Sequence, residues 1–402
     1  MSTYTFSCRN CDWQTAATER VSACPECDSL LEVELADLPG ELVTDENRYD
    51  IYRYADWLPT SDIEWLSNGE GWTPLVEAPA LATVENETTT VLVKNETTNP
   101  TWSWKDRMAA MVVSHAVADG ADRIATATTG NHGSAIAAYA ARAGVDRTLV
   151  LVDPSSEPPH HAQMRAYGAA SVELTDGGES QRLLAELAEL GWFVAYGIDG
   201  RFTGQPYVYE GYKTIAFEIV EQHGVPGAVV AAVGAGDGLY GIWKGFRELK
   251  NAGIIEETPA MVSAEAHERH PLAVAYEEGA ERVGTDPGPE PLSTSTKSPT
   301  TGDHALAAVR NSGGRPAVVD REEIARAIRA CGRAGVFLEP ASALAAAGAT
   351  QLASEDEFDT VVAVGTGAGV SWPEKTTELL GSYPTVEPAL DELRTVVPFS
   401  LD

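Results

Sequence analysis

Short apolar runs alternate with helix-like patterns along most of the chain, from about residue 90 to residue 365. Each run holds four or five residues, mainly Val, Ile, Leu, Ala and Thr. Because an uninterrupted apolar run suits a strand that is buried on both faces, we expect an α/β protein whose parallel sheets carry helices on both sides. The pattern predicts strands over 91–94, 124–128, 148–152, 171–174, 229–233, 261–264 and 361–364, and helices over 105–119, 134–143, 160–167 and 239–250.

Parallel sheets of this kind bind their ligands in the loops at the carboxyl ends of the strands, so the chemistry is expected there. Residues 40–72 are aromatic and acidic, and residues 284–303 are rich in Pro, Ser and Thr. The second of these stretches predicts a long loop, either a linker or a mobile flap over an active site.

Charge is the unusual feature of the composition. Among the 402 residues, 28 Lys and Arg face 60 Asp and Glu, which gives a formal net charge of −32 spread along the whole chain. The hydrophobic fraction of 44% is that of a globular protein. A strongly acidic surface repels phosphate backbones and anionic membranes, so we expect neither nucleic acid nor a membrane among the partners.

Lysine is scarce, so each lysine is a candidate for a specific role. A dispersed acidic surface with few lysines is typical of adaptation to high salt, and an ordinary acidic cytosolic protein is the alternative. Residues 1–10 lack a basic region followed by an apolar run, so we expect a cytoplasmic protein. The lysines are Lys94, Lys105, Lys213, Lys244, Lys250, Lys297 and Lys375.

Four of the five cysteines, Cys8, Cys11, Cys24 and Cys27, follow the pattern C-x2-C-x12-C-x2-C. Two close pairs at this spacing can present four thiolates to one metal, which is the zinc-ribbon arrangement. Two disulfides or a redox pair are the alternatives, and a reducing cytosol disfavours the disulfides. We expect a structural zinc, because four protein ligands leave no open position for water.

Three glycine-rich segments, 128–133, 233–241 and 364–369, each follow a predicted strand. Glycines at a strand-to-helix turn expose backbone N–H groups at the start of the helix, which suits an anion such as phosphate. The second segment holds a Gly-x-Gly-x-x-Gly fingerprint beginning at Gly236, with Glu265 after the next strand. A nicotinamide-dependent Rossmann enzyme is therefore a rival interpretation, although it does not account for the other two segments.

The segment at residues 99–107 opens a predicted helix and reads Asn-Pro-Thr-Trp-Ser-Trp-Lys-Asp-Arg. It resembles the Asn-Pro-Thr-Gly-Ser-Phe-Lys-Asp-Arg segment of the pyridoxal-phosphate enzymes of the tryptophan-synthase-β superfamily (fold type II), and within it of threonine synthases. Residues 24–33 resemble the zinc knuckle of archaeal-type threonine synthases, and 210–218 resemble their Glu-Gly-Gln-Lys-Thr stretch. Residues 335–343 nearly match another block of the family, so the resemblance covers almost the whole chain.

The resemblance implies two doubly wound parallel-sheet domains with a small amino-terminal zinc ribbon. It also implies pyridoxal 5'-phosphate and structural zinc as cofactors, a small amino-acid substrate and a homodimer. The expected domains are a zinc-ribbon-like knuckle at 1–38, a large cofactor-binding α/β domain at 39–108 and 206–402, and a small α/β domain at 109–205.

The resemblance also implies roles for individual residues. Lys105 would carry the cofactor and act as general base and acid, while Asn131 would bind the cofactor's phenolic oxygen. Thr366 would contact the pyridine nitrogen; a turn residue between glycines is the alternative. The phosphate cradle would be Gly234, Ala235, Gly236, Asp237 and Gly238, and the substrate carboxylate would bind Thr128, Thr129 and Gly130, for which simple helix capping is the alternative.

Two further side chains, Glu339 and His304, are expected to have no catalytic role. Glu339, at a predicted helix start, is interpreted as a helix-terminal charge or a capping group. His304 is interpreted as a surface or packing histidine.

The chain departs from the family pattern beside the expected site. Trp102 and Trp104 replace Gly and Phe, and two indoles near the lysine should narrow the pocket. Threonine synthases carry an arginine for the substrate phosphate two places before Glu-Gly, and that place is Val208 here. Their Thr-Gly-His-Gly-Leu-Lys loop is Thr-Gly-Ala-Gly-Val-Ser at 366–371. The cations that could substitute for the arginine are Arg201, Lys213 and Lys297.

Three function hypotheses remain beside the Rossmann rival. The first is a threonine synthase, which converts O-phosphohomoserine and water to threonine and phosphate. The second is an ammonia-lyase acting on threonine, serine or a diamino acid, or a β-replacement synthase acting on O-phosphoserine. The third is a non-catalytic metabolite sensor whose zinc ribbon recruits a partner, and an intact Lys105 argues against it.

Overall fold

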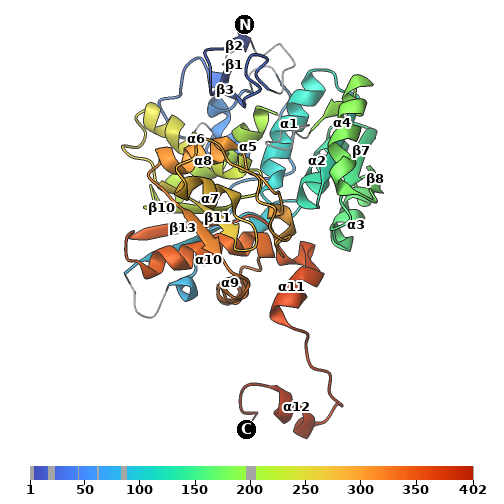
Figure 1. The fold of residues 1–402 in the computed structure, drawn as a ribbon, viewed down its shortest axis with the longest axis vertical. Coiled ribbons are helices and arrows are strands. Elements are labelled where there is room, and N and C mark those ends of the chain that lie inside the picture. Colours follow the sequence, from blue (N-terminus) through green and yellow to red (C-terminus); the bar gives the residue numbers. More distant parts are fainter. Residues whose placement is uncertain are drawn as a thin grey trace.

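The structure, a computed structural model, describes residues 4–16, 23–43, 45–60, 63–82, 88–195 and 205–401. In this part of the chain the strands form three sheets, and Figure 1 shows the smallest of them at the amino terminus. Among the helices of the described residues, there is no candidate for a membrane span.

The largest sheet has the strand order β12-β11-β10-β13-β5-β4. Neighbouring strands pair in parallel except β4, which runs antiparallel to β5 at the edge. Val229 and Ala231 of β10 face an apolar layer with α1, α5, α6 and α8, while Ala228 and Val230 face α9 and α10. The continuous apolar run of β10 therefore reflects burial on both faces. The strands are β4 (Leu75–Glu77), β5 (Thr90–Asn95), β10 (Ala228–Ala232), β11 (Ala260–Ala266), β12 (Pro316–Val319) and β13 (Thr360–Gly365).

Helices packed around this sheet come from both ends of the chain. Those that bury an apolar face against it lie on its two sides, as Figure 1 shows. They are α1 (Lys105–Ala118), α5 (Tyr207–Gln222), α6 (Asp237–Asn251), α7 (Pro271–Glu277), α8 (Asp303–Asn311), α9 (Arg321–Arg333) and α10 (Pro340–Ser354). Short 3-10 helices are η1 (Ile51–Trp57), η2 (Pro79–Leu81), η3 (Glu96–Thr98), η4 (Gly177–Glu179), η5 (Thr294–Thr296) and η6 (Gly369–Ser371).

The second parallel sheet has the order β8-β7-β6-β9. Val150 and Val152 of β7 pack with Met164 of α3 on one face, whereas Leu151 packs with Leu184 of α4 on the other. This sheet is thus also covered on both sides. Its elements are β6 (Arg123–Thr128), α2 (Asn131–Arg142), β7 (Arg147–Val152), α3 (Pro158–Ala166), β8 (Ala170–Glu173), α4 (Ser180–Glu189) and β9 (Phe193–Val194).

The amino-terminal sheet is antiparallel and consists of β1 (Tyr4–Cys8), β2 (Gln14–Ala16) and β3 (Leu31–Leu35). Its buried Glu32 accepts hydrogen bonds from the Tyr240 hydroxyl and from Arg247, both on α6. Burial alone would raise the pKa of Glu32, but Arg247, Lys244 and Arg9 lower it to about 2. These charged contacts fix the small sheet to the helix that follows the second glycine segment.

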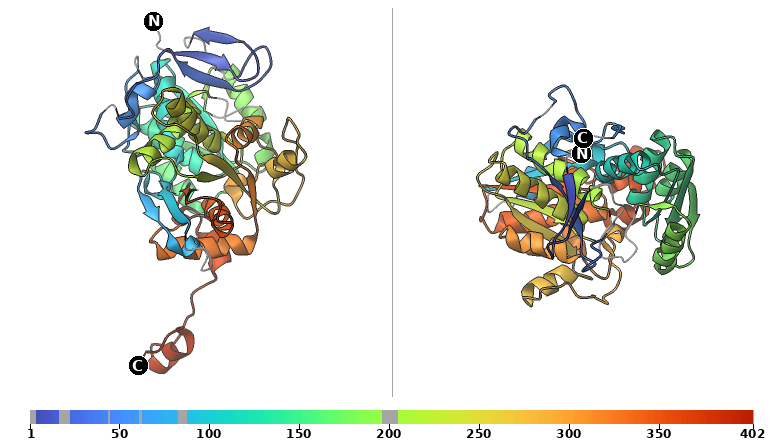
Figure 2. Two further views of the ribbon diagram at one scale, coloured as in Figure 1. Left: turned by 90° about the vertical axis from the view of Figure 1, so that its left-hand side faces the viewer. Right: turned by 90° about the horizontal axis from the view of Figure 1, so that it is seen from above.

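The carboxyl-terminal segment leaves the body of the molecule. Figure 2 shows the chain running from α11 (Pro373–Leu380) to α12 (Leu390–Val396), which lies apart from the other elements. No side chain of α12 is buried.

The structure confirms the predicted fold class of a mixed α/β protein with parallel sheets. Every predicted strand and helix has a counterpart, with ends that differ by a few residues. The sequence pattern gave no bounds for α4, α5 or α7 to α10, although it placed Glu339 at the helix start that is now α10. A capping box formed by Asp320 and Glu323 marks the start of α9 and could have revealed it. The exact domain boundaries stay a prediction.

Candidate active site

A cavity of about 970 Å³ lies where the loops that follow β6, β10 and β13 meet the 284–303 loop. Parallel strands bring their carboxyl-terminal loops to one edge of the sheet, which is why segments distant in sequence meet here. Gly130 is not among the lining residues; it faces the His160 ring, 2.6 Å from where a Cβ would stand. The predicted site residues that line the cavity are Lys105, Thr128, Thr129, Asn131, Gly234, Ala235, Gly236, Asp237, Gly238 and Thr366.

Lys105 is the first residue of α1 and reaches into the cavity between two aromatic rings. Its Nζ lies 5.8 Å from the ring centre of Trp104 and 5.6 Å from that of Tyr212. Burial lowers the pKa of Lys105, although the carboxylates of Asp237 and Glu339 oppose the shift. A lowered pKa favours the neutral amine, which is the form that acts as a nucleophile or a base.

The residues around Lys105 hold it in place through buried polar contacts. The backbone N–H of Thr101 donates to Asp106 at 2.8 Å, and its hydroxyl donates to the same carboxylate at 2.9 Å. Arg107 is fully buried and binds Glu96 at 2.7 Å and Glu218 at 2.6 Å. The polar residues of the segment therefore shape the turn, and Lys105 alone carries a reactive group into the cavity.

The glycine segment after β10 has no room for a side chain at Gly236 or Gly238. Gly236 has φ 94°, and a Cβ there would lie 2.4 Å from the Cβ of Ala305. A Cβ on Gly238 would lie 2.1 Å from the Trp104 ring. The segment ends at the start of α6, where free backbone N–H groups and the helix dipole favour an anion.

Asp237, the first residue of α6, is a buried carboxylate in this segment. The Tyr209 hydroxyl donates to it at 2.9 Å, and Nε2 of His304 lies 3.4 Å from it. Burial alone would raise the pKa of Asp237, but the hydrogen bond from His304 lowers it. His304 thus contacts the carboxylate of the glycine segment, which goes beyond the packing role expected for it.

Asn131 and Glu339 meet across the cavity. The Asn131 amide donates to the Glu339 carboxylate at 2.9 and 3.2 Å, and among the described residues its Oδ1 is buried without a partner. Burial raises the pKa of Glu339 to about 7, against the effects of Asn131, Trp372 and Lys105. The cavity therefore contains a carboxyl group with a pKa of about 7, whereas the sequence predicts only a helix-terminal charge or a capping group. The sequence signal for this side chain is its place within the family block at 335–343.

Thr366 follows β13, and its hydroxyl lies 2.9 Å from the Ser342 hydroxyl. Ser342 also accepts a hydrogen bond from the Gly367 N–H at 2.7 Å and donates to the Gly367 carbonyl at 2.9 Å. Ser342 therefore fixes the turn that presents Thr366 to the cavity. Sequence analysis did not identify Ser342, which lies in the same family block as Glu339.

The segment at the start of α2 combines helix capping with an open hydroxyl. The Thr128 hydroxyl accepts hydrogen bonds from the N–H groups of Gly130 and Gly133 at 2.8 and 2.9 Å, so capping is its observed role. Thr129 lines the cavity beside it. His132, which was not predicted, also lines the cavity, and burial lowers its pKa to about 3, so it stays neutral at pH 7.

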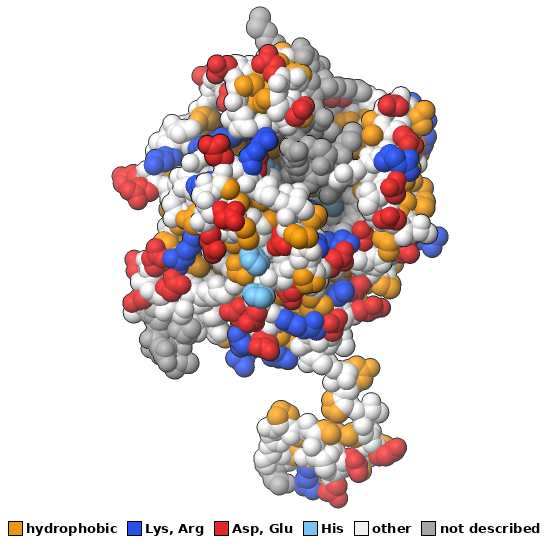
Figure 3. All heavy atoms as spheres, viewed as in Figure 1, with side chains coloured by type: hydrophobic (Ala, Val, Ile, Leu, Met, Phe, Trp, Pro, Cys, Tyr) orange, Lys and Arg blue, Asp and Glu red, His pale blue; other side chains and the backbone are white. Residues whose placement is uncertain are grey.

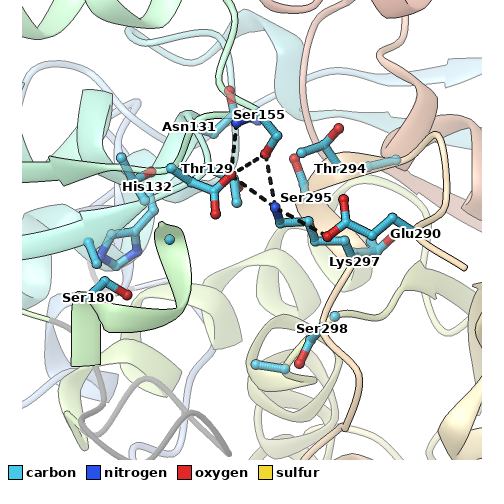
Figure 4. Close-up of a pocket in the computed structure, with 18 of the residues that line it drawn as sticks. Thr129, Asn131, His132, Ser155, Ser180, Glu290, Thr294, Ser295, Lys297 and Ser298 are labelled. Carbon is cyan, nitrogen blue, oxygen red and sulfur yellow. Dashed lines mark hydrogen bonds and ion pairs between the residues drawn. The ribbon is translucent and has the colours of Figure 1, made fainter. Parts of the chain in front are cut away.

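The 284–303 loop closes one side of the cavity and contributes Lys297. Its Nζ lies 2.9 Å from Oδ1 of Asp153 and 3.0 Å from Oγ of Ser155, both after β7, and 3.9 Å from Glu290 (Figure 4). Arg269 supports the loop by donating to the carbonyls of Lys297 and Gly288. This contact favours the flap interpretation of the loop over the linker interpretation.

The departures from the family pattern have different structural consequences. Val208 is fully buried in α5 and does not line the cavity, while Trp104 lines it and Trp102 is 41% exposed outside it. Lys213 is buried between Glu210 and Glu248, at 2.5 and 2.8 Å. Arg201 lies outside the described residues. Of the two candidate cations within the described residues, Lys297 lines the cavity and Lys213 does not.

These features fit pyridoxal phosphate. The glycine segment exposes its backbone at a helix start, and the unpartnered Oδ1 of Asn131 and the Thr366 hydroxyl face the same space as Lys105. A phosphate, a polar ring and an aldehyde each find a matching group there.

The four clustered cysteines form a second candidate centre, away from the cavity. Their Sγ atoms all lie within 4.8 Å of one another, with Cys8 to Cys27 at 3.4 Å and Cys11 to Cys24 at 3.6 Å. All are free thiols. Four sulfurs at about 2.3 Å from one zinc ion stand about 3.8 Å apart, so the four Sγ atoms are close enough together to bind one metal ion.

Comparison with known proteins identifies the family. Residues 66–367 match the model described as "Pyridoxal-phosphate dependent enzyme". The threonine synthase of Methanocaldococcus jannaschii is 32% identical over 383 residues, covering 91% of this chain and 93% of the relative. That of Methanosarcina acetivorans is 30% identical, covering 98% of each chain.

Solved structures confirm the fold. The processed form of threonine deaminase isoform 2 from Solanum lycopersicum superimposes with a TM-score of 0.66 at 21% identity, covering 86% of this chain and 99% of the other. Maize serine racemase superimposes with a TM-score of 0.65 at 18% identity, covering 83% and 98%. The chain therefore belongs to the fold type II pyridoxal-phosphate dependent enzymes and is a threonine synthase-like member of that family.

Proposed function

We propose that this enzyme converts O-phosphohomoserine and water to threonine and phosphate. Its similarity to threonine synthases extends over nearly the whole chain, which supports this reaction. The geometric observation that carries the proposal is that Lys297 lines the same cavity as Lys105. Lys105 is suited to the amino-acid end of the substrate, and Lys297 is suited to its phosphate.

Lys105 would bind the cofactor, with the segment from Gly234 to Gly238 holding its phosphate, Asn131 its phenolic oxygen and Thr366 its pyridine nitrogen. Pyridoxal phosphate supplies an electron sink for the carbon from which a proton leaves. A hydroxyl beside the pyridine nitrogen leaves that nitrogen largely unprotonated, which favours elimination and replacement over transamination.

Lys105 would move the protons. Since burial lowers its pKa, a neutral amine would be available to take a proton from Cα of the substrate. After releasing that proton, the same amine would take one from Cβ, and it would return protons later in the reaction. Glu339, whose pKa is raised to about 7, accepts a hydrogen bond from the Asn131 amide. Its carboxylate would balance the positive charge of a protonated Lys105 nearby. The N-terminus of α2, with Thr129, would hold the substrate carboxylate.

Lys297 would hold the substrate phosphate in place of the arginine that the family carries where this chain has Val208. The phosphate would displace Asp153 from Lys297 and gain the Ser155 hydroxyl, which lies 3.0 Å from the same Nζ. Because Lys297 belongs to the 284–303 loop, phosphate binding would also draw this loop over the reacting atoms and limit access to water.

The test is a substrate panel. The purified holoenzyme, kept in concentrated salt, is given O-phosphohomoserine, O-phosphoserine, threonine, serine and diaminopropionate, and released phosphate and ammonia are measured. Phosphate release with stoichiometric threonine from O-phosphohomoserine is the expected result. Negligible phosphate release, with rapid ammonia release from threonine or serine, would overturn the proposal.

A second function is favoured by one observation, the acidity of the cavity wall. Asp153, Asp176 and Glu290 lie on the side where a substrate phosphate would bind, and like charges there oppose a dianion. An ammonia-lyase acting on threonine, serine or a diamino acid would meet no such repulsion. The same substrate panel distinguishes the two functions, and it includes the β-replacement alternative on O-phosphoserine.

We further propose that Cys8, Cys11, Cys24 and Cys27 hold one structural zinc ion, for which the Sγ distances are suited. We also propose a cytoplasmic homodimer adapted to high salt. Free thiols suit a reducing compartment, and the net charge of −32 suits a concentrated electrolyte. Metal analysis and sedimentation equilibrium in molar salt test the zinc content and the dimer.

A further inference from the structure

A second cavity, of about 400 Å³, lies between the cysteine-bearing sheet and the start of α8. Figure 1 shows this sheet above α6 and α8. The walls are the two cysteine turns on one side, and on the other the start of α8 together with Glu281 and Arg282, which follow α7. A volume of this size suits a small metabolite, since small-molecule pockets begin at about 300 Å³.

The cavity carries charges of both signs. Arg9 and Arg282 contribute guanidinium groups, and the carboxylates come from Asp28, Glu281 and Asp303. Arg282 is 70% exposed, and its guanidinium pairs with Asp303 at 3.4 Å at the mouth of the cavity. Arg9 is held more firmly, 5.3 Å over the Tyr240 ring and 5.5 Å over the Trp243 ring.

This mixture of charges selects among ligand classes. A phosphate would face three carboxylates, and a metal cation would face two guanidinium groups, so neither is well matched. A molecule with a carboxylate and an ammonium group side by side matches both sets. We propose that this cavity, which we call the ribbon cavity, binds a free α-amino acid as an effector, with its carboxylate on Arg9 and Arg282 and its ammonium group on Asp303 and Asp28.

The ribbon cavity shares a wall with the active-site cavity. His304 lines the ribbon cavity, and its Nε2 lies 3.4 Å from Asp237, which lines the active site. The N–H of Gly302 donates to the Ala235 carbonyl at 3.0 Å, and the Thr301 hydroxyl donates to the Gly234 carbonyl at 2.8 Å. The first turn of α8 thus supports the phosphate cradle directly.

An amino acid that contacts Gly302, Asp303 and His304 would change how firmly these hydrogen bonds hold the cradle. Its binding is therefore coupled to the order of the Gly234–Gly238 segment, whichever substrate the active site takes. By linkage, an active-site ligand that orders the cradle changes the affinity of the ribbon cavity by the same factor.

The test separates this cavity from the active site. Borohydride-treated holoenzyme, in which the cofactor is fixed to the protein and cannot exchange with free amino acids, is titrated calorimetrically with the common amino acids, inorganic phosphate and Mg²⁺. One amino acid is expected to bind with a stoichiometry of one per chain. Binding of phosphate or Mg²⁺ in place of any amino acid would overturn the proposed ligand class.

Two variants locate the binding. Arg282→Ala removes an exposed guanidinium, and Ala307→Phe fills the cavity from α8; each is expected to weaken binding roughly 10-fold or more. Arg321→Ala, which removes an exposed arginine paired with Glu378 elsewhere, is the matched control and should bind normally. Binding that survives both cavity variants would overturn the proposed site.

Hydrogen exchange then tests the coupling. The amides of 234–241 are expected to change protection when the amino acid binds to the borohydride-treated enzyme, and not in Arg282→Ala. Unchanged exchange in the presence of bound amino acid would contradict the shared-wall argument. Because these measurements do not depend on turnover, their failure is distinct from a failure of the proposed threonine synthase reaction.

Discussion

Lys297 is the residue whose replacement tests the proposed substrate most directly. Lys297→Met keeps the length of the side chain and removes the ammonium group that lies 2.9 Å from Asp153 and 3.0 Å from Ser155. In the proposed complex this ammonium group faces the substrate phosphate. Its loss removes one charge-assisted hydrogen bond, a contribution of about 1.5–3 kcal/mol.

Asp153 adds to the effect. Without Lys297, its carboxylate is an unopposed negative charge beside the phosphate, and two like charges about 4 Å apart repel by about 1 kcal/mol even in water. The sum, about 2.5–4 kcal/mol, predicts that kcat/KM for O-phosphohomoserine falls roughly 70- to 1,000-fold. Stability should change little, because the Lys297–Asp153 pair is partly exposed and such pairs contribute about 0–1 kcal/mol.

The assay measures phosphate release against substrate concentration for the wild type, Lys297→Met, Lys297→Arg and the control Lys250→Met, which alters an exposed lysine near the end of α6. Lys297→Arg should recover much of the activity, because it restores the cation. Ammonia release from serine, which has no phosphate, should be nearly unchanged in Lys297→Met. An unchanged kcat/KM for the phosphorylated substrate in that variant would refute the reasoning.

Borohydride reduction of the holoenzyme and peptide mapping should find the cofactor on Lys105, and a label on another lysine would remove the central assignment. Cys24→Ser should lose zinc and lower the melting temperature while the visible spectrum of the cofactor persists; full stability without zinc would contradict a structural role. The carboxyl group of Glu339 has an ordinary pKa of 4.5, which applies to the unfolded chain, and a pKa of about 7 in the folded protein. Between these two pH values the folded state binds more protons than the unfolded state, so the free energy of unfolding falls as the pH rises. In the apoprotein, Glu339→Gln should flatten this part of the melting temperature profile, and an unaltered profile would count against the raised pKa. The melting temperature of the wild type should rise with salt, since the Debye length falls from about 10 Å at 0.1 M to about 3 Å at 1 M; a melting temperature independent of salt would oppose the halophilic interpretation.

Local patterns predicted most of the architecture, because a buried parallel strand and the turn that follows it have local requirements. The run at 229–233 is apolar since both faces of β10 are covered. The next glycines are required because a Cβ at Gly236 or Gly238 would collide with Ala305 or Trp104. The residue type at such a position is determined by a few neighbouring residues, so a local sequence pattern can predict the structure there.

The residues that were missed depend on contacts between distant segments. Glu339 becomes a cavity group only because Asn131, more than 200 positions earlier, is brought against it. His304 gains its role through Asp237 in the same way. Val208 occupies the place of the family's arginine in the sequence, but the structure buries its side chain within α5, and Lys297 reaches the cavity from a loop that no local motif connects to it.

The scarcity of lysine acquires a structural explanation. Lys94, Lys213 and Lys244 are almost completely buried in ion pairs, while Lys105 and Lys297 line the active-site cavity. The other two of the seven lysines are Lys250, which is exposed, and Lys375, which is partly exposed. Lysine has thus been kept chiefly where an internal carboxylate or a ligand needs an ammonium group.

The internal ion pairs also show which part of the protein carries the net charge. Each of the two buried clusters contains two cations and two carboxylates, so its formal charge is zero. The first is Lys94, Arg107, Glu96 and Glu218, and the second is Lys213, Lys244, Glu210 and Glu248. The whole charge of −32 therefore belongs to groups outside these clusters, and Figure 3 shows acidic side chains dispersed over the face in view. Since salt screens exposed charges and reaches buried pairs weakly, added salt should relieve the repulsion at the surface while leaving the pairs around Lys105 intact.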